Sequence, residues 1–214
     1  MYLDRTRDSP SSKTIRILRV VERKSNVPEA QPRGGRGARE RILWAAATLF
    51  YGEGIHATGV ERLTDYAHVS KRTFYQHFPS KNALVKEYLA GAEHSSVAEQ
   101  GLERADLTAR ERLLAIFVEP TSGRVRGCVF HNAAVESAGN LPDVGEAVAA
   151  HKRAFTRRLV ETAAEAGAVD PEVLGRRLAV LFEGATALAT SLDDRTPVRD
   201  ARGIAEVLVD AAIP

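Results

Sequence analysis

Residues 69–84 have the sequence VSKRTFYQHFPSKNAL and carry two helix-start signals in close succession. Ser70 is a favoured N-cap residue, because its side-chain oxygen can accept a hydrogen bond from a backbone amide of the first turn. The helix that it opens ends near His77-Phe78-Pro79, and Ser80 caps the longer helix that follows. The stretch therefore predicts a short polar helix followed, after a tight break, by a longer one.

A second short helix is expected immediately before this stretch. Residues 58–61, TGVE, form a capping-box pattern in which the Thr58 hydroxyl bonds the amide of Glu61 and the Glu61 carboxylate reaches back. The helix that starts there runs to about Ala67, and only residues 68–70 separate it from the next helix. Two short helices joined by a three-residue turn are a helix-turn-helix arrangement.

The chemistry of the second short helix favours DNA as its partner. Such a helix fits a major groove about 12 Å wide. The unpaired amides of its first turn carry partial positive charge that suits phosphate. Val69, Phe74 and Phe78 face the other way and are expected to pack on the first short helix and on Leu49 and Phe50. Because many helical hairpins bind nothing, an interaction module without specific DNA binding stays an alternative.

The chain divides by composition at about residue 38. Residues 1–39 hold ten Lys and Arg against four Asp and Glu, a net charge of +6, whereas the remainder carries a net charge of −4. Residues 1–37 contain three prolines and the run RGGRG, which predicts a flexible basic leader. The leader either adds contacts to a polyanion or is a solvated extension without a role.

The rest of the chain predicts helices and no strand. We expect an all-α fold of about nine helices, with a three-helix head at 38–84 and a larger antiparallel helical bundle at 85–214. The body helices are expected at 108–119, 127–138, 142–167, 171–192 and 199–212. In the fourth of these, Asp170 is the N-cap and Pro171 takes the first helical position. Leucine and alanine then recur at coiled-coil spacing, namely at Leu174, Leu178, Leu181, Ala185, Leu188 and Leu192.

Several function classes lack their sequence signals. The chain of 214 residues has 44% hydrophobic and 27% charged residues, and no stretch has the length and apolarity of a membrane span. No secretion signal is evident, which predicts a cytoplasmic protein. A single cysteine leaves no set of thiolates for a zinc site. Phosphate-binding glycine loops and catalytic motifs are not found, so neither enzyme activity nor a cofactor or metal is expected.

Residues 54–63, GIHATGVERL, and residues 69–84 together resemble the signature of the TetR family of transcriptional regulators. The most specific part is Tyr-x-His-Phe followed by Ser-Lys-x-x-Leu, and the resemblance extends over 38–84. Residues 126–130, RGCVF, and 132–136, NAAVE, are similar to one subgroup of the family. The resemblance implies a DNA-binding head on a body that binds a small-molecule effector and forms a homodimer, usually as a repressor.

The resemblance also implies which residues touch double-stranded operator DNA. Lys71, Arg72 and Thr73 would contact bases, and Ser70 would combine capping with contact. The remaining residues would contact or approach the phosphate backbone, which sets affinity and register. These are Thr58, Tyr75, His77 and Lys81.

Two positions depart from the family pattern. His68 stands where the turn usually has glycine, and Tyr66 stands where alanine is usual. A left-handed backbone is less favourable for histidine than for glycine, so the turn is expected to carry some strain. His68 is interpreted either as a tolerated substitution or as an additional DNA contact.

Dimerisation is assigned to 171–192 and 199–212, because one head reads only a few base pairs and specificity needs a two-fold site. The alternative is an ordinary intramolecular bundle. The interface is expected to include Leu181, Ala185, Leu188, Leu192, Ile204 and Leu208.

The effector pocket is expected among the larger side chains of the middle helices, since ligand pockets are mostly apolar with a few polar groups. For any one of these residues, a plain core position is the more common role. The expected lining comprises Tyr88, Phe117, Phe130, His131, Phe155 and Phe182, with Asn132, Glu136 and His151 as further polar groups.

Cys128 offers a second possibility for sensing. It lies three residues before His131, so the two share a helical face. A thiolate beside a basic group is a redox sensor or nucleophile, whereas a lone cysteine between apolar residues is more often a small buried hydrophobe. A regulator that senses redox conditions through Cys128 therefore stays an alternative.

Overall fold

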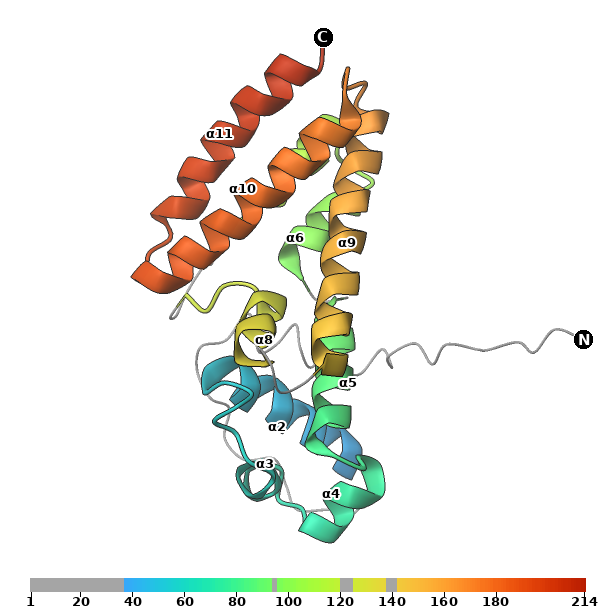
Figure 1. Cartoon of the computed structure of the whole chain (residues 1–214), viewed down its shortest axis with the longest axis vertical. Coiled ribbons are helices and arrows are strands. Elements are labelled where there is room, and N and C mark those ends of the chain that lie inside the picture. Colours follow the sequence, from blue (N-terminus) through green and yellow to red (C-terminus); the bar gives the residue numbers. More distant parts are fainter. Residues whose placement is uncertain (1–36, 94–95, 120–124, 138–141) are drawn as a thin grey trace, which may run out of the picture.

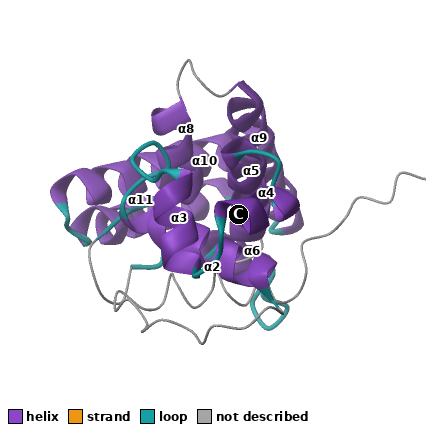
Figure 2. Cartoon of the chain, turned by 90° about the horizontal axis from the view of Figure 1, so that it is seen from below, coloured by secondary structure: helices purple, strands orange, loops and turns teal. Residues whose placement is uncertain are grey.

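The computed structural model describes residues 37–93, 96–119, 125–137 and 142–214 (Figure 1). The expected basic leader lies outside the described residues, apart from Gly37. The described part is all-helical, as the sequence predicts, with no strand (Figure 2). Its helices are α2 (Ala38–Gly52), α3 (Val60–Ala67), α4 (Lys71–His77), α5 (Lys81–Glu93), α6 (Val97–Leu102), α7 (Ala109–Leu114), α8 (Val129–Ser137), α9 (Pro142–Glu165), α10 (Pro171–Leu192) and α11 (Thr196–Ala212).

The head consists of α2, α3 and α4 around one apolar core. Phe74 and Phe78 are almost completely buried in that core together with Leu49 and Phe50, and Val69 packs against it. This confirms the packing that the sequence predicts for the inner side of α4. Their burial leaves the polar residues of α4 on the outer side.

The head does not have a core of its own, because helices of the body complete it. Phe130 and Ala133 on α8 and Val144 and Val148 on α9 belong to the same buried cluster as the head residues. In addition, α5 runs unbroken from residue 81 to residue 93 and so crosses the expected boundary at residue 84. A displacement of α8 or α9 therefore changes the packing of the head core.

A second core holds the body together between α7, α9, α10 and α11. Leu159 on α9 and Leu174 and Leu178 on α10 are buried there, next to Ala205 and Val209 on α11. The start of α10 has the predicted cap, in which the Asp170 carboxylate accepts a hydrogen bond of 3.0 Å from the amide of Val173. Figure 1 shows α10 and α11 at the opposite end of the molecule from α4.

Two body elements differ from the sequence prediction. The expected helix at 108–119 ends at Leu114, and the amide of Phe117 bonds the carbonyl of Leu114, a tighter spacing than an α-helix allows. This change of direction buries Ile116 and Phe117 in the second core. The six-residue α6 was not predicted, because so short a helix shows less than two turns of periodicity.

The segment before α8 depends on a glycine. Gly127 has φ +63°, and a Cβ atom there would lie 2.1 Å from the Thr190 hydroxyl oxygen of α10. Only a residue without a side chain fits both this backbone conformation and this approach. Gly127 therefore holds the start of α8 directly against α10.

Candidate DNA interface and effector cavity

The outer side of α4 presents polar and cationic side chains to solvent. Ser70 caps the helix as predicted, accepting a hydrogen bond of 3.0 Å from the Thr73 amide. Lys71 and Arg72 are exposed, and Tyr75 is 54% exposed although its neighbour Phe74 is buried. The exposed side of α4 therefore combines cations, a hydroxyl and a phenol, which are groups that contact phosphates and base edges.

The predicted capping box at the start of α3 is wrong. The N-cap is Gly59, and no side chain caps this helix. The Thr58 side chain is instead fully buried, and its hydroxyl donates a hydrogen bond of 2.7 Å to the Gly54 carbonyl oxygen. It thus closes the turn after α2 and is not available to a phosphate. Glu61 consequently remains free to face α4.

Glu61 forms an ion pair with Lys71 across the helix-turn-helix. The Lys71 ammonium lies 3.0 Å from the Glu61 carboxylate, and the hydrogen bond between them raises the pKa of the lysine. Both side chains are more than half exposed, so the pair contributes little to stability. An anionic partner can therefore displace Glu61 at little cost, but it has to compete with this carboxylate for Lys71.

The turn between α3 and α4 adopts the left-handed conformation that the family pattern accommodates with glycine. His68 has φ 51° and is exposed. Histidine is among the non-glycine residues that tolerate this region, with some strain. Tyr66, the other departure, stacks on Trp44 with ring centroids 5.1 Å apart, so it contributes packing within the head.

Lys81 and His77 lie at the far end of α4 and the start of α5. His77 is exposed, whereas Lys81 is partly buried, and this burial lowers the pKa of its ammonium. The negative charge of Glu136 on α8 acts against this and raises the pKa of Lys81. Ser80 caps α5 by accepting a hydrogen bond of 3.1 Å from the Ala83 amide, as predicted.

A cavity of about 360 Å³ lies in the body, where α6, α8, α9 and α10 meet. Its size is at the lower end of the range of ligand pockets, roughly 300–1,000 Å³. Of the six expected pocket residues, Phe130, Phe155 and Phe182 line it. Phe117 lies behind the wall, edge-on to Phe182, with ring centroids 6.0 Å apart.

The other two expected pocket residues do not line this cavity. Tyr88 is buried in the first core against Phe50, and His131 is half-buried on α8. The sequence analysis missed several polar groups of the wall, because they come from segments whose meeting no local pattern records. These groups are Glu99, Lys152, Glu183 and Thr186.

The polar end of the cavity contains a buried acid and a buried imidazole. Glu99 and His151 are each less than a tenth exposed, with the Glu99 carboxylate 3.6 Å from Nδ1 of His151. Burial raises the pKa of Glu99 to about 7. Burial, with help from Lys152 and Arg158, lowers the pKa of His151 to about 3. His151 is thus neutral at physiological pH, and the two side chains do not form a salt bridge.

Cys128, Lys152 and Glu183 form another part of the cavity wall. Lys152 forms a partly buried ion pair with Glu183, and its ammonium lies 3.2 Å from the Cys128 sulfur. Asn132 and Glu136, also considered as pocket groups, point elsewhere: the Asn132 amide donates to the Arg126 carbonyl. The Glu136 carboxylate accepts a hydrogen bond of 2.8 Å from the backbone amide of His56 in the α2–α3 turn.

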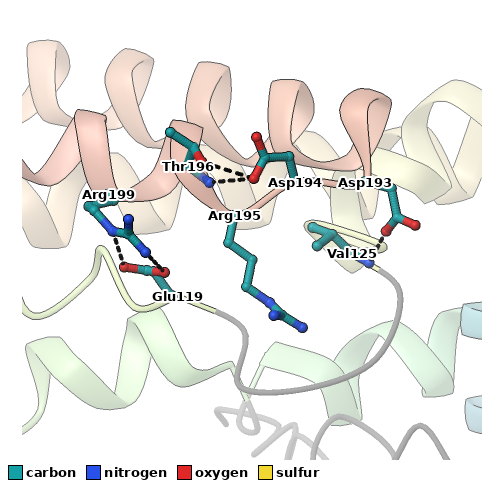
Figure 3. A pocket seen from close by; sticks show the side chains of 7 residues that line it. All are labelled: Glu119, Val125, Asp193, Asp194, Arg195, Thr196 and Arg199. Atoms are coloured by element: carbon teal, nitrogen blue, oxygen red, sulfur yellow. Dashed lines mark hydrogen bonds and ion pairs between the residues drawn. The ribbon is translucent and has the colours of Figure 1, made fainter.

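A second, more open hollow lies beside the turn between α10 and α11 (Figure 3). Its polar wall is largely satisfied internally: Arg199 holds Glu119 with two hydrogen bonds of 2.9 and 3.0 Å. Asp194 accepts from the amide and hydroxyl of Thr196. Asp193 accepts a hydrogen bond of 2.8 Å from the Val125 amide. The hydrogen bonds around the hollow therefore connect the segment after α7 to the α10–α11 turn and the start of α11.

The expected dimer residues divide into two groups. Ala185 is buried within the second core, whereas Leu181 and Leu208 pack against that core and are only partly buried. Leu188, Leu192 and Ile204 are instead between 51% and 60% exposed. Val180 on α10 and Val207 on α11 are exposed as well and extend this apolar surface.

The described residues contain no group of three or more metal-ligating side chains. Within the same part of the chain, no helix is both long enough and apolar enough to cross a membrane.

Comparisons with known proteins agree with this architecture along most of the chain. Residues 42–88 match the family described as bacterial regulatory proteins, tetR family. Residues 107–205 match the tetracyclin repressor-like C-terminal domain. The crystal structure of a TetR-family transcriptional regulator from Streptomyces coelicolor has 30% sequence identity and a TM-score of 0.73, over 83% of this chain and 90% of that one. A second structure, from Streptomyces avermitilis, has 33% identity and a TM-score of 0.68, over 82% and 97%.

Two curated relatives match over shorter stretches. The HTH-type transcriptional repressor KstR2 of Rhodococcus jostii is 35% identical over 89 residues, 38% of this chain and 44% of that protein. The HTH-type transcriptional activator FasR of Mycolicibacterium smegmatis is 40% identical over 81 residues, 36% of each protein. The match thus spans less than half the length of either curated relative. Family and fold are those of transcriptional regulators rather than enzymes, and the chain belongs to the TetR family of DNA-binding transcriptional regulators.

Proposed function

We propose that this regulator binds a palindromic operator as a homodimer and is released from it by a small molecule in the body cavity, which makes it a repressor. The observation that carries this proposal is the position of α8. Phe130 on α8 lines the cavity and belongs to the core shared with the head. Further along the same helix, Glu136 binds the His56 amide of the α2–α3 turn. Any ligand that moves α8 also moves the DNA-binding helices.

On the DNA side, α4 is the recognition helix of the proposal. Lys71, Arg72 and Thr73 read bases from its first turns, and Ser70 contributes a hydroxyl at its start. Tyr75, His77 and Lys81 contact phosphates and set the register. Thr58 is left out, because its hydroxyl is bound to the Gly54 carbonyl inside the head.

The homodimer forms through the exposed apolar surface of α10 and α11. Three exposed apolar residues lie along one side of α10, separated by eight and by four positions: Val180, Leu188 and Leu192. Ile204 and Val207 lie on the exposed side of α11. Gly184 lies between Val180 and Leu188, and Gly203 directly precedes Ile204; neither has an atom near the place of a Cβ atom, so a second copy can approach closely. Pairing two copies here buries apolar surface and combines two heads on one two-fold site.

Repression is the direction of control that follows most simply from release by ligand. The two curated relatives are named as a repressor and an activator, so family membership alone leaves both directions open. A promoter fused to a reporter, with and without the regulator, distinguishes them. Higher expression in the absence of the regulator is the expected result.

The experiment that tests the proposal is a footprint of the purified protein on DNA flanking its own gene. We expect protection of a palindromic site by two copies of the chain, with affinity that falls as salt rises. The same DNA then serves to screen small molecules for release. No specific protection at low as well as moderate salt, on this DNA and on a genomic fragment library, would refute operator binding.

A redox-sensing alternative has one supporting observation. The Cys128 sulfur lies at the cavity wall, 3.2 Å from the Lys152 ammonium. If this alternative holds, peroxide releases the wild-type protein from its operator but leaves a Cys128→Ser variant bound. Equal behaviour of the two proteins would eliminate it.

A further inference from the structure

The polar end of the body cavity has a chemistry that selects among ligands. Glu99 on α6 and His151 on α9 both line the cavity, and both side chains are more than nine-tenths buried. They lie side by side, with the Glu99 carboxylate 3.6 Å from Nδ1 of His151. This separation is longer than a hydrogen bond, so neither group satisfies the other.

His151 is held in place and lacks a partner at one nitrogen. Its ring stacks on Phe130 with centroids 3.4 Å apart and planes inclined by 5°. Within the described part of the chain, Nδ1 is buried and has no hydrogen-bond partner. Because the imidazole is neutral, this nitrogen can act as an acceptor when Nε2 carries the proton. A buried polar atom of this kind costs free energy until a ligand satisfies it.

The cations around Glu99 are already engaged by other groups. Arg158 approaches the Glu99 carboxylate at 3.6 Å, but it also binds the Glu103 carboxylate at 3.1 Å and the Glu99 carbonyl oxygen at 3.3 Å. Lys152 is paired with Glu183. A ligand anion would have to displace one of these carboxylates, whereas a ligand cation would meet a carboxylate whose nearest cation, Arg158, is 3.6 Å away and is shared with Glu103.

Apart from the Lys152–Glu183 ion pair and a few polar side chains such as Thr186, the remainder of the wall is mostly apolar. Ile116, Phe155 and Phe182 contribute a hydrocarbon surface that continues from the polar end. A ligand that fits has one polar end and an apolar body that together occupy about 360 Å³.

We propose that the cavity takes an organic cation, an amine with an apolar body, whose ammonium group donates hydrogen bonds to the Glu99 carboxylate and to Nδ1 of His151. Both groups are acceptors and one is negatively charged, so they match an ammonium donor and disfavour a carboxylate. This inference rests on the proposed function, since it assigns the chemistry of the same effector cavity.

The protonation of Glu99 links this binding to pH. Because burial raises the pKa of this carboxyl to about 7, the free protein releases a proton when an ammonium binds near neutral pH. The charged and titratable groups around Glu99 are Glu93 on α5, Glu103 directly after α6, and Lys152 and Arg158 on α9, besides the neutral His151. Amine affinity is expected to rise by about tenfold between pH 6 and pH 8.

The test uses three probes that share one apolar body: phenylbutylamine, phenylbutanol and phenylbutanoic acid. Isothermal titration of the full-length protein gives a dissociation constant for each. We expect the amine to bind at least about tenfold more tightly than the alcohol, because it donates a hydrogen bond to a buried charge. The acid should bind weakest. In Glu99→Gln the preference for the amine over the alcohol should disappear, while phenylbutanol affinity stays within about twofold of wild type.

Glu119→Gln is the matched control. Glu119 also lines the cavity, but Arg199 holds it with two hydrogen bonds, so this variant should keep the amine preference. The inference is overturned if the alcohol or the acid binds as tightly as the amine, if Glu99→Gln keeps the preference, or if none of the three binds. The footprint without ligand tests operator binding separately, so either operator binding or the amine preference can fail without the other.

Discussion

Replacing Glu99 by glutamine should stabilise the protein in a pH-dependent way. The substitution keeps the shape of the side chain and removes its ionisation. In the folded protein the pKa of Glu99 is about 7, against 4.5 for an exposed glutamate, and burial is the main cause. The folded state therefore holds this proton more tightly than the unfolded state. The contribution of this site to wild-type stability is fully present below pH 4.5 and is lost progressively as the pH rises to about 7.

The size of the effect follows from the two pKa values. The difference between the folded and unfolded pKa of Glu99 corresponds to about 3 kcal/mol of unfolding free energy. Relaxation of the site in solution will make the measured value smaller. The variant lacks this loss, so the stability difference between variant and wild type should grow by up to about 3 kcal/mol from pH 5 to pH 8. For a protein of this size that is a change in Tm of roughly 6–12 °C.

Urea unfolding at pH 5 and pH 8, at one fixed protein concentration, measures the difference directly. Glu119→Gln is the control with the opposite sign, because the hydrogen bond from Arg199 lowers the pKa of Glu119. Its stabilising contribution is present above the unfolded pKa and is lost as the pH falls. A Glu99→Gln stability difference that is the same at both pH values would show that Glu99 is not a buried acid and refute the reasoning.

Four further substitutions test the interfaces. Tyr75→Phe should weaken binding to specific and non-specific DNA alike, by about tenfold, because it removes a phosphate contact; unchanged affinity in a gel shift would exclude that contact. Glu61→Gln should tighten DNA binding severalfold by freeing Lys71, to which the carboxylate is bound at 3.0 Å; equal or weaker affinity would contradict this competition. Glu136→Ala should lower the free energy of unfolding by about 1 kcal/mol, since a turn amide of the head loses its acceptor, and urea unfolding that matches wild type would count against the link. Leu188→Glu should convert the dimer to monomers in sedimentation velocity, and a persistent dimer would place the interface elsewhere.

Local chemistry made much of the head predictable. The Ser70 and Ser80 caps, the short α4 and the burial of Phe74 each depend on residues within one or two turns of chain. Such signals hold because a cap or an amphipathic side is set by residues a few positions apart. The start of α10 at Pro171 was predicted for the same reason.

The wrong or incomplete predictions concern residues for which the sequence pattern suggests one partner and the folded chain supplies another. Thr58 suits a capping box by sequence, but the turn after α2 folds back and takes its hydroxyl for the Gly54 carbonyl. Ala185 fits an interface seam by spacing, yet it is buried in the second core of the protomer. In both cases the competing partner was not visible in the local pattern.

The family, the all-helical fold and the outer surface of α4 could be derived from the amino-acid sequence alone, because periodicity, caps and the TetR signature are local properties. His151 was named from the sequence as a possible polar group of the pocket, but only the tertiary structure revealed that Glu99 lies beside it in the cavity, since α6 and α9 meet only when the bundle closes. It also revealed the connection from that cavity through α8 to the head, as the Glu136 carboxylate and the His56 amide are 80 residues apart. Burial and long-range contact shift pKa values and create cavities, and neither can be read from spacing along the chain.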